Sequence, residues 1–145
     1  MVELSRYLFL AGALPYIVLG IIHALITPLT PEQAKGLSPR DPEYRRGMTQ
    51  QTVFLTRRIN LWEGWVSFNL SHSLGLVLFG VMVLLAGRSA AAFEANASFV
   101  PFAVVVSAAY LAIGLRYWFR TPILGASITG VCFIASWVLR MLAGR

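Results

Sequence analysis

Charged residues are scarce in this sequence of 145 residues. Asp, Glu, Lys and Arg together make up 12% of the chain, about half of the roughly 25% that is usual in soluble domains. Hydrophobic residues make up 57%, and the mean hydropathy is +0.69. A soluble domain of this size buries only about two-thirds of the surface of its unfolded chain. That is too little to hide so much apolar surface from water, so the composition predicts an integral membrane protein.

Cysteine is nearly absent as well, because Cys132 is the only one in the chain. A single cysteine excludes an internal disulfide and a Cys-x-x-Cys redox centre, and with them the four-helix oxidoreductases that couple thiols to quinones. Acidic residues number six against twelve Lys and Arg, which gives a net charge of +6. Most of these basic residues lie in loops and at helix ends, where they set topology and meet lipid headgroups. We therefore expect membrane lipids, and not nucleic acid, as partners.

Four hydrophobic runs are long enough to cross a bilayer, which takes roughly 20 residues. They cover about residues 7–26, 60–85, 99–118 and 122–142. Backbone groups in hydrocarbon must pair within their own segment, so each run is expected to be a helix. The first run is too long for the apolar part of a signal peptide and is interrupted by Pro15 and His23, so we expect it to be retained. The predicted fold is all-α, a four-helix transmembrane bundle forming a single domain over 1–145.

The first connection, residues 27–59, is much longer than the other two and holds four prolines. We expect a short interfacial helix over 31–37, and 48–58 is compatible with an extension of the second helix. Connections this long are often functional. Lys and Arg number eight in the first and third connections with their helix ends, against four at the termini and second connection. The positive-inside rule then predicts a multi-pass protein of the cell membrane with cytoplasmic first and third loops and both termini outside.

The second helix carries most of the polar residues. At about 100° per residue it divides into two polar faces. One face holds Arg58, Trp62, Trp65, Asn69 and His72. The other holds Arg57, Asn60, Gly64, Ser67 and Ser71, with Glu63 at its edge. Asn69 and His72 lie about 14–18 Å from Asn60 along the helix, near mid-bilayer, where an unpaired polar group is costly. The His72 face is therefore expected to point into the protein.

Other polar residues are expected near the first connection. His23 lies near the end of the first helix, and Arg116 ends the third, in a stripe with Tyr110, Gly114 and Tyr117. This predicts a funnel with His23, Glu63 and Arg116 at its mouth and the second-helix pair deeper. The candidate ligand-binding residues are Trp62, Trp65, Asn69, His72, Tyr110 and Arg116. The candidate acid or base groups are His72, Glu63 and His23. The alternative is that these residues only join helices, anchor them at the interface or reach toward water.

No cofactor and no metal are expected. If both helices begin at opposite membrane faces, His23 and His72 differ in depth by roughly 10 Å, which argues against bis-histidine haem. Two histidines and one acid do not supply the usual ligands of zinc or a diiron centre. The serines beside His72 are its neighbours in sequence and do not face it, which disfavours a Ser–His nucleophile. In the fourth helix, a stripe of small residues predicts a packing seam. The stripe comprises Gly125, Thr129, Cys132 and Ser136.

Residues 56–62 and 68–75, with the motif Phe-Asn-x-Ser-His-Ser-x-Gly, resemble an uncharacterised family of small bacterial membrane proteins, as does 116–119 followed by Pro122. The resemblance implies a four-helix membrane protein and brings no activity. Three hypotheses remain. The first is a protein that binds a lipid or other hydrophobic small molecule in an intramembrane polar pocket. The second is an enzyme doing His and Glu acid–base chemistry on a lipid-like substrate. The third is a structural or accessory subunit, acting as a homo-oligomer or with a partner membrane protein.

Overall fold

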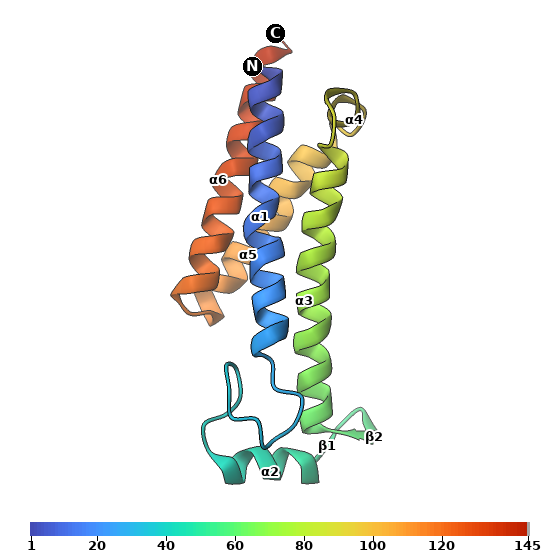
Figure 1. The fold of residues 1–145 in the computed structure, drawn as a ribbon, viewed down its shortest axis with the longest axis vertical. Coiled ribbons are helices and arrows are strands. Elements are labelled where there is room, and N and C mark those ends of the chain that lie inside the picture. The colour runs from blue at the N-terminus through green and yellow to red at the C-terminus, as the bar shows by residue number, and fades with distance from the viewer. Residues whose placement is uncertain (145) are drawn as a thin grey trace. The chain divides into compact units, whose positions relative to one another are not determined.

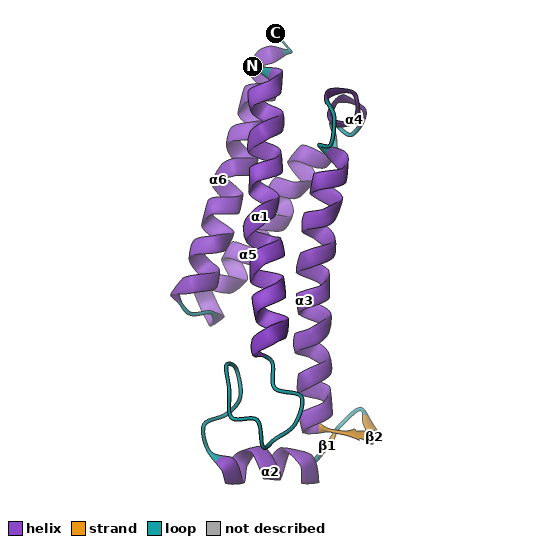
Figure 2. Ribbon diagram, in the orientation of Figure 1, coloured by secondary structure: helices purple, strands orange, loops and turns teal. Residues whose placement is uncertain are grey.

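The fold is all-α apart from one small hairpin. A computed structural model describes residues 1–144 (Figures 1 and 2). The long helices are α1 (Val2–Ile26), α3 (Leu61–Ala86), α5 (Phe99–Tyr117) and α6 (Arg120–Ala143). The shorter elements are α2 (Pro42–Gln50), β1 (Thr52–Val53), β2 (Thr56–Asn60) and α4 (Ala90–Ala95). All four long helices are long and apolar enough to cross a membrane, which confirms the four predicted spans to within five residues at each end.

The residues group into two compact units. The core unit is Met1–Leu19 with Leu76–Arg145, and the loop unit is Gly20–Gly75. The prediction of a single domain over 1–145 stays a prediction. Helix α1 continues through Pro15 without interruption, because neighbouring helices and local adjustments can satisfy the carbonyl that proline leaves without a donor.

The centre of the core unit is aromatic. Phe9 is fully buried and lies 5.5 Å, centroid to centroid, from both Phe93 and Phe133. Tyr16 packs in the same way on Phe79 at 5.6 Å. Helix α4, which the sequence analysis did not expect, supplies Phe93 from the connection between α3 and α5. Ring pairs at these distances are favourable beyond the area that they bury, so a short connecting helix contributes to the core.

The predicted seam on α6 is confirmed and faces α1. Ser5 donates a hydrogen bond to the backbone carbonyl of Ser136 at 2.8 Å. About two helical turns further along α1, Gly12 lies against Cys132. Gly125 then contacts Leu19, and the stripe residues Gly125, Thr129 and Ser136 are buried. Small residues let helix backbones approach closely, which replaces the hydrophobic driving force that lipid does not provide.

The loop unit differs from the sequence prediction in two places. Residues 31–37 form turns and not a helix, since Gly36 takes a φ of 51° there. A helix forms further along the chain, at α2. Asp41 caps its start by accepting a hydrogen bond from the Glu43 backbone N–H at 2.8 Å, and Pro42 takes the first helical position. Residues 51–58 do not extend α3, because β-branched residues around Val53 pair with β2 as a hairpin.

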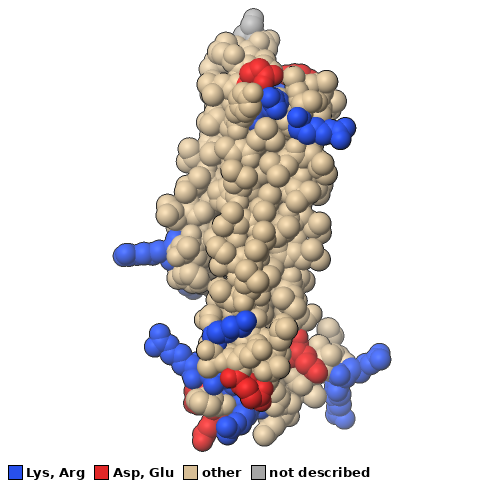
Figure 3. All heavy atoms as spheres, in the orientation of Figure 1, with Lys and Arg blue, Asp and Glu red and all other residues tan. Residues whose placement is uncertain are grey.

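Charge is distributed as a membrane protein requires. Figure 3 shows Lys and Arg side chains near both ends of the helices, with most of them at the end that carries α2 and the hairpin, and a mostly uncharged surface in between apart from a basic side chain at one edge. Basic residues outside the spans bind headgroups and water at no desolvation cost, whereas a charge in the hydrocarbon costs several kcal/mol (about 2.5–3.5 by insertion scales). The membrane location is therefore supported by length, apolarity and charge placement together.

Candidate functional site

The loop unit brings three polar side chains together between the last turns of α1 and the middle of α3. His23 Nε2 lies 2.9 Å from Asn69 Oδ1. The His23 and His72 rings meet edge to face, with 5.2 Å between centroids. Asn69 is buried and both histidines are half-buried. We call these three residues the His–Asn cluster.

The hydrogen bonds of Asn69 determine which ring nitrogen of His23 carries the proton. Asn69 Nδ2 donates to the backbone carbonyl of Trp65 at 2.7 Å, so the amide oxygen points at His23. An amide oxygen only accepts hydrogen bonds, and His23 Nε2 must therefore be the donor. In the neutral ring Nδ1 is then an acceptor, and no described residue of the chain donates a hydrogen bond to it.

The position of His23 corrects the predicted funnel. The sequence analysis placed His23 at the mouth and roughly 10 Å away in depth from His72, whereas the two rings are in contact. The cause is the start of α3. Trp62 Nε1 donates to the Leu29 carbonyl at 3.2 Å, so the first turn of α3 lies beyond the end of α1 and not level with it. The eight residues from Leu61 to Asn69 then rise about 12 Å, which brings Asn69 to the level of His23.

The predicted inward face of the second helix is confirmed from Trp62 onward. Trp62 is 3% exposed and its ring lies 5.1 Å from that of Trp65. Phe68 stacks on His72 at 6.3 Å with an interplanar angle of 11°. Ser67 and Ser71, on the opposite face, are exposed. Arg58 does not belong to the face, because it lies in β2 before the helix begins.

Glu63 does not join the His–Asn cluster, because it caps α3. Its carboxylate accepts a hydrogen bond from the Asn60 backbone N–H at 2.9 Å, and Asn60 Oδ1 accepts one from the Glu63 backbone N–H at 2.8 Å. This reciprocal arrangement is a capping box. The spacing Asn-x-x-Glu before an apolar run is its signature, so the sequence contained the information that identifies this role.

Tyr110 and Arg116 belong to the core unit, whereas the His–Asn cluster belongs to the loop unit. Tyr110 is half-buried and its ring lies 5.5 Å from Tyr16 and 6.0 Å from Trp118. Arg116 is exposed and lies over the Tyr117 ring at 5.3 Å. The predicted convergence of Tyr110 and Arg116 with His72 stays a prediction.

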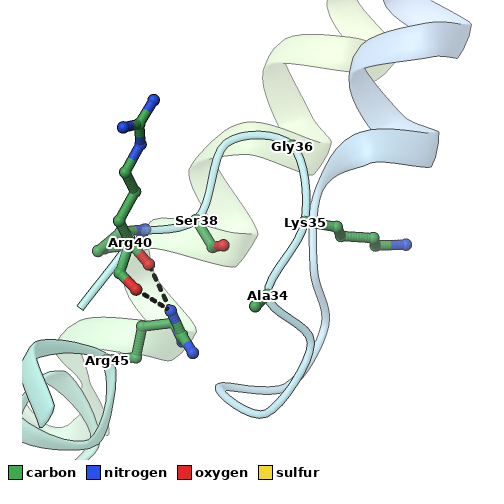
Figure 4. A pocket seen from close by; sticks show the side chains of 7 residues that line it. Ala34, Lys35, Gly36, Ser38, Arg40 and Arg45 are labelled. Carbon is green, nitrogen blue, oxygen red and sulfur yellow. Dashed lines mark hydrogen bonds between the residues drawn. The ribbon is translucent and has the colours of Figure 1, made fainter. Parts of the chain in front are cut away.

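Arg45 organises the first connection, a role that sequence reasoning missed. Its side chain is 6% exposed. The guanidinium donates to the carbonyl oxygens of Pro31 at 2.7 Å, Pro39 at 2.6 Å and Arg40 at 2.9 Å. It lines a surface hollow of about 280 Å³ between the turns and α2, from which the Lys35 and Arg40 side chains point away (Figure 4). A buried arginine that serves three carbonyls holds the loop in shape, because each carbonyl would otherwise need water.

Two further hollows open on the loop unit. One of about 420 Å³ is lined by Leu29, Trp62, Glu63, Val66, Ser67 and Leu70. The other, of about 430 Å³, lies between α2 and the start of α3. Trp62 is the one predicted ligand-binding residue on the first of them, and neither is lined by the His–Asn cluster.

The positions of the two histidines bear on whether the protein could hold a metal ion or a haem. Within residues 1–144, no three His, Cys, Asp or Glu side chains are grouped closely enough to hold a metal ion. The depth argument against bis-histidine haem is wrong, because the two histidines lie at one level. Their rings instead touch each other directly, so a porphyrin could be ligated by both only if they separated.

The segment that carries the family resemblance, residues 68–75, includes Asn69 and His72 within α3. The motif therefore supplies two of the three members of the His–Asn cluster. Membership of that family stays a prediction. Searches of family models, of curated proteins and of solved structures found no match to this chain.

Proposed function

We propose that this membrane protein binds the polar head of a lipid or other hydrophobic small molecule at the His–Asn cluster. The observation that carries the proposal is the contact of His23 with both Asn69 and His72 between two apolar helices. Polar groups within membrane helices are costly and mark functional sites by default. A histidine in contact with two further polar side chains exceeds what one helix–helix hydrogen bond requires.

The chemistry of the cluster favours a ligand with a hydrogen-bond donor. His23 Nδ1 offers a hydrogen-bond acceptor, because the His23 Nε2–H group donates its hydrogen bond to Asn69 Oδ1. The Phe68 ring flanks His72, and the Trp62–Trp65 pair lies nearer the start of α3. Aromatic walls around a few placed polar groups are typical of small-molecule sites. A hydroxyl or amide head on an apolar tail matches both features.

Native mass spectrometry of gently purified protein, followed by lipid extraction, tests the proposal. Wild-type protein is expected to carry a defined hydrophobic adduct. His72→Leu is expected to retain it about 3- to 10-fold less, because loss of the ring that packs on His23 costs about as much as one hydrogen bond. Ser71→Ala is the matched control, since Ser71 is the exposed neighbour of His72 and bonds only the Phe68 carbonyl. A wild-type protein that is empty under mild conditions, or a His72→Leu variant that retains the adduct in full, would count against the site.

An enzyme is the second candidate, and the pair of imidazoles 5.2 Å apart favours it. A neutral ring can accept a proton from the substrate while the other ring, when protonated, donates one, which is general acid–base chemistry. Glu63 is not needed for it, because its carboxylate caps α3. Conversion of the extracted adduct by wild-type protein, and not by His72→Leu, would establish this candidate. Stability measurements distinguish the structural alternative. If the His–Asn cluster is purely structural, substitution of any of its residues lowers the stability of the protein, and the wild-type protein carries no adduct.

A further inference from the structure

The hairpin before α3 exposes an apolar tip. Phe54 and Leu55 connect β1 to β2, and their exposed fractions are 111% and 94%. Neither side chain packs on the rest of the described chain to any useful extent. A two-stranded hairpin is at best marginally stable in water, so an unpacked tip of Phe and Leu needs another apolar surface to stabilise it.

Two arginines flank this tip. Only two residue pairs join the strands, Thr52 with Asn60 and Val53 with Thr56. The three residues between the paired positions of β2 therefore bulge out of the ladder. Arg57 and Arg58 are two of these residues, and both are exposed. Within residues 1–144, neither makes an ion pair, since the two salt bridges there involve Arg6 and Arg140.

The hairpin stands at the boundary of a membrane span. Asn60 ends β2 and Leu61 begins α3 with no residue between them. The Leu61 backbone N–H also donates to the Gln51 carbonyl at 2.7 Å, which joins the base of the hairpin to the start of the helix. Figure 1 shows β1 and β2 leaving the foot of α3 sideways. Asn60 follows Phe54 by six positions, so the tip reaches at most about 20 Å from the start of the helix.

We propose that this hairpin docks on the anionic headgroups of the bilayer that α3 crosses. Phe54 and Leu55 enter the boundary between headgroups and acyl chains, where apolar and aromatic side chains of membrane proteins are favoured. Arg57 and Arg58 bind lipid phosphates, which match the arginine fork in charge and geometry. The unpaired arginines favour lipid over an apolar protein partner, because in a bilayer the headgroup phosphates lie next to the acyl chains.

A fluorescent label at the tip tests the proposal in the full-length protein. The background is Cys132→Ala, and Leu55→Cys carries an environment-sensitive fluorophore. Tyr44→Cys is the matched control, on α2 of the same unit and also exposed. The samples are nanodiscs of phosphatidylcholine with and without phosphatidylglycerol, with doxyl lipids as quenchers. The tip label is expected to shift to the blue and to be quenched in anionic nanodiscs, and the control label is expected to do neither.

Removal of the arginines separates the charge contribution. Each of Arg57→Gln and Arg58→Gln should lower the ratio of docked to undocked hairpins about five-fold, and 1 M salt should abolish the difference between lipid compositions. Both arginine side chains are exposed, so the Gln variants are expected to keep the hairpin backbone, and a loss of fold would not explain such a result. A tip label that stays in water in all lipids overturns the proposal. A label that is shielded but not quenched by doxyl lipids also overturns it, in favour of a protein occupant.

Discussion

The hydrogen bond between His23 and Asn69 should be measurable as a coupling energy. Replacing Asn69 with Leu keeps the volume of the side chain and removes the acceptor of the His23 proton, 2.9 Å away. It also removes the bond to the Trp65 carbonyl, but that carbonyl keeps its place in the helix ladder. Hydrogen bonds between membrane helices are worth about 0.6 kcal/mol on average and up to about 1.7 kcal/mol. Asn69 is only 7% exposed, so the upper half of that range is expected.

A double-mutant cycle of His23→Leu and Asn69→Leu isolates this value. Reversible unfolding of the four proteins by dodecyl sulfate in mixed micelles gives the free energies. The single Asn69→Leu change is expected to cost about 1–2 kcal/mol, since it also leaves the His23 N–H without a partner. The coupling energy is expected to be about 1–1.7 kcal/mol. Ser71→Ala paired with His23→Leu is the control and should be additive to within about 0.3–0.5 kcal/mol. A coupling no larger than that of the control would refute the tautomer argument and the cluster with it.

Three further predictions concern residues outside the cluster. Thr129→Val should be neutral or stabilise the protein by about 1 kcal/mol, because the buried Thr129 hydroxyl has no hydrogen-bond partner within residues 1–144. Ser136→Ala should destabilise it by about 1 kcal/mol, because the hydrogen bond between the Ser136 and Ser5 hydroxyls is lost. The opposite order of stability in dodecyl sulfate unfolding would contradict the packing of the seam. Glu63→Gln should keep both fold and adduct, because glutamine also closes a capping box, and loss of adduct from a folded Glu63→Gln protein would place that carboxyl in the site. Arg45→Met should leave the helices intact and expose the first connection to protease, because three carbonyls lose their donor; unchanged cleavage kinetics would show that the loop does not depend on Arg45.

The spans were predictable because each depends on length and apolarity alone. The seam on α6 was predictable for the same kind of reason, since small residues repeat at helical spacing and lipid leaves few other ways to pack helices. The inward face of α3 followed from the cost of placing Asn69 in hydrocarbon. In each case the physical constraint acts on one helix at a time, and one sequence is enough to apply it.

The level of His23 was not predictable, because it depends on how two helices are offset. The sequence analysis placed the start of α3 to within one residue, at 60 against Leu61, but no sequence pattern shows how far that start lies beyond the end of α1. The contact of Trp62 with Leu29 sets that offset, and it lies within a loop whose turns depend on Arg45. Sequence patterns do not reveal which carbonyls a buried arginine will reach. The hairpin at Val53 was missed because a segment this short is compatible with both helix and strand.

Nitrogen-15 spectroscopy of histidine-labelled protein tests the central claim most directly. The chain has two histidines, so the spectrum contains only four ring-nitrogen signals. In delipidated protein we expect His23 to carry its proton on Nε2 and to show an unprotonated Nδ1, as the orientation of Asn69 requires. Returning the extracted lipid should move the His23 Nδ1 signal, and Asn69→Leu should abolish the tautomer preference. A proton on His23 Nδ1, or ring-nitrogen chemical shifts that do not change when the lipid is returned, would contradict the proposed site.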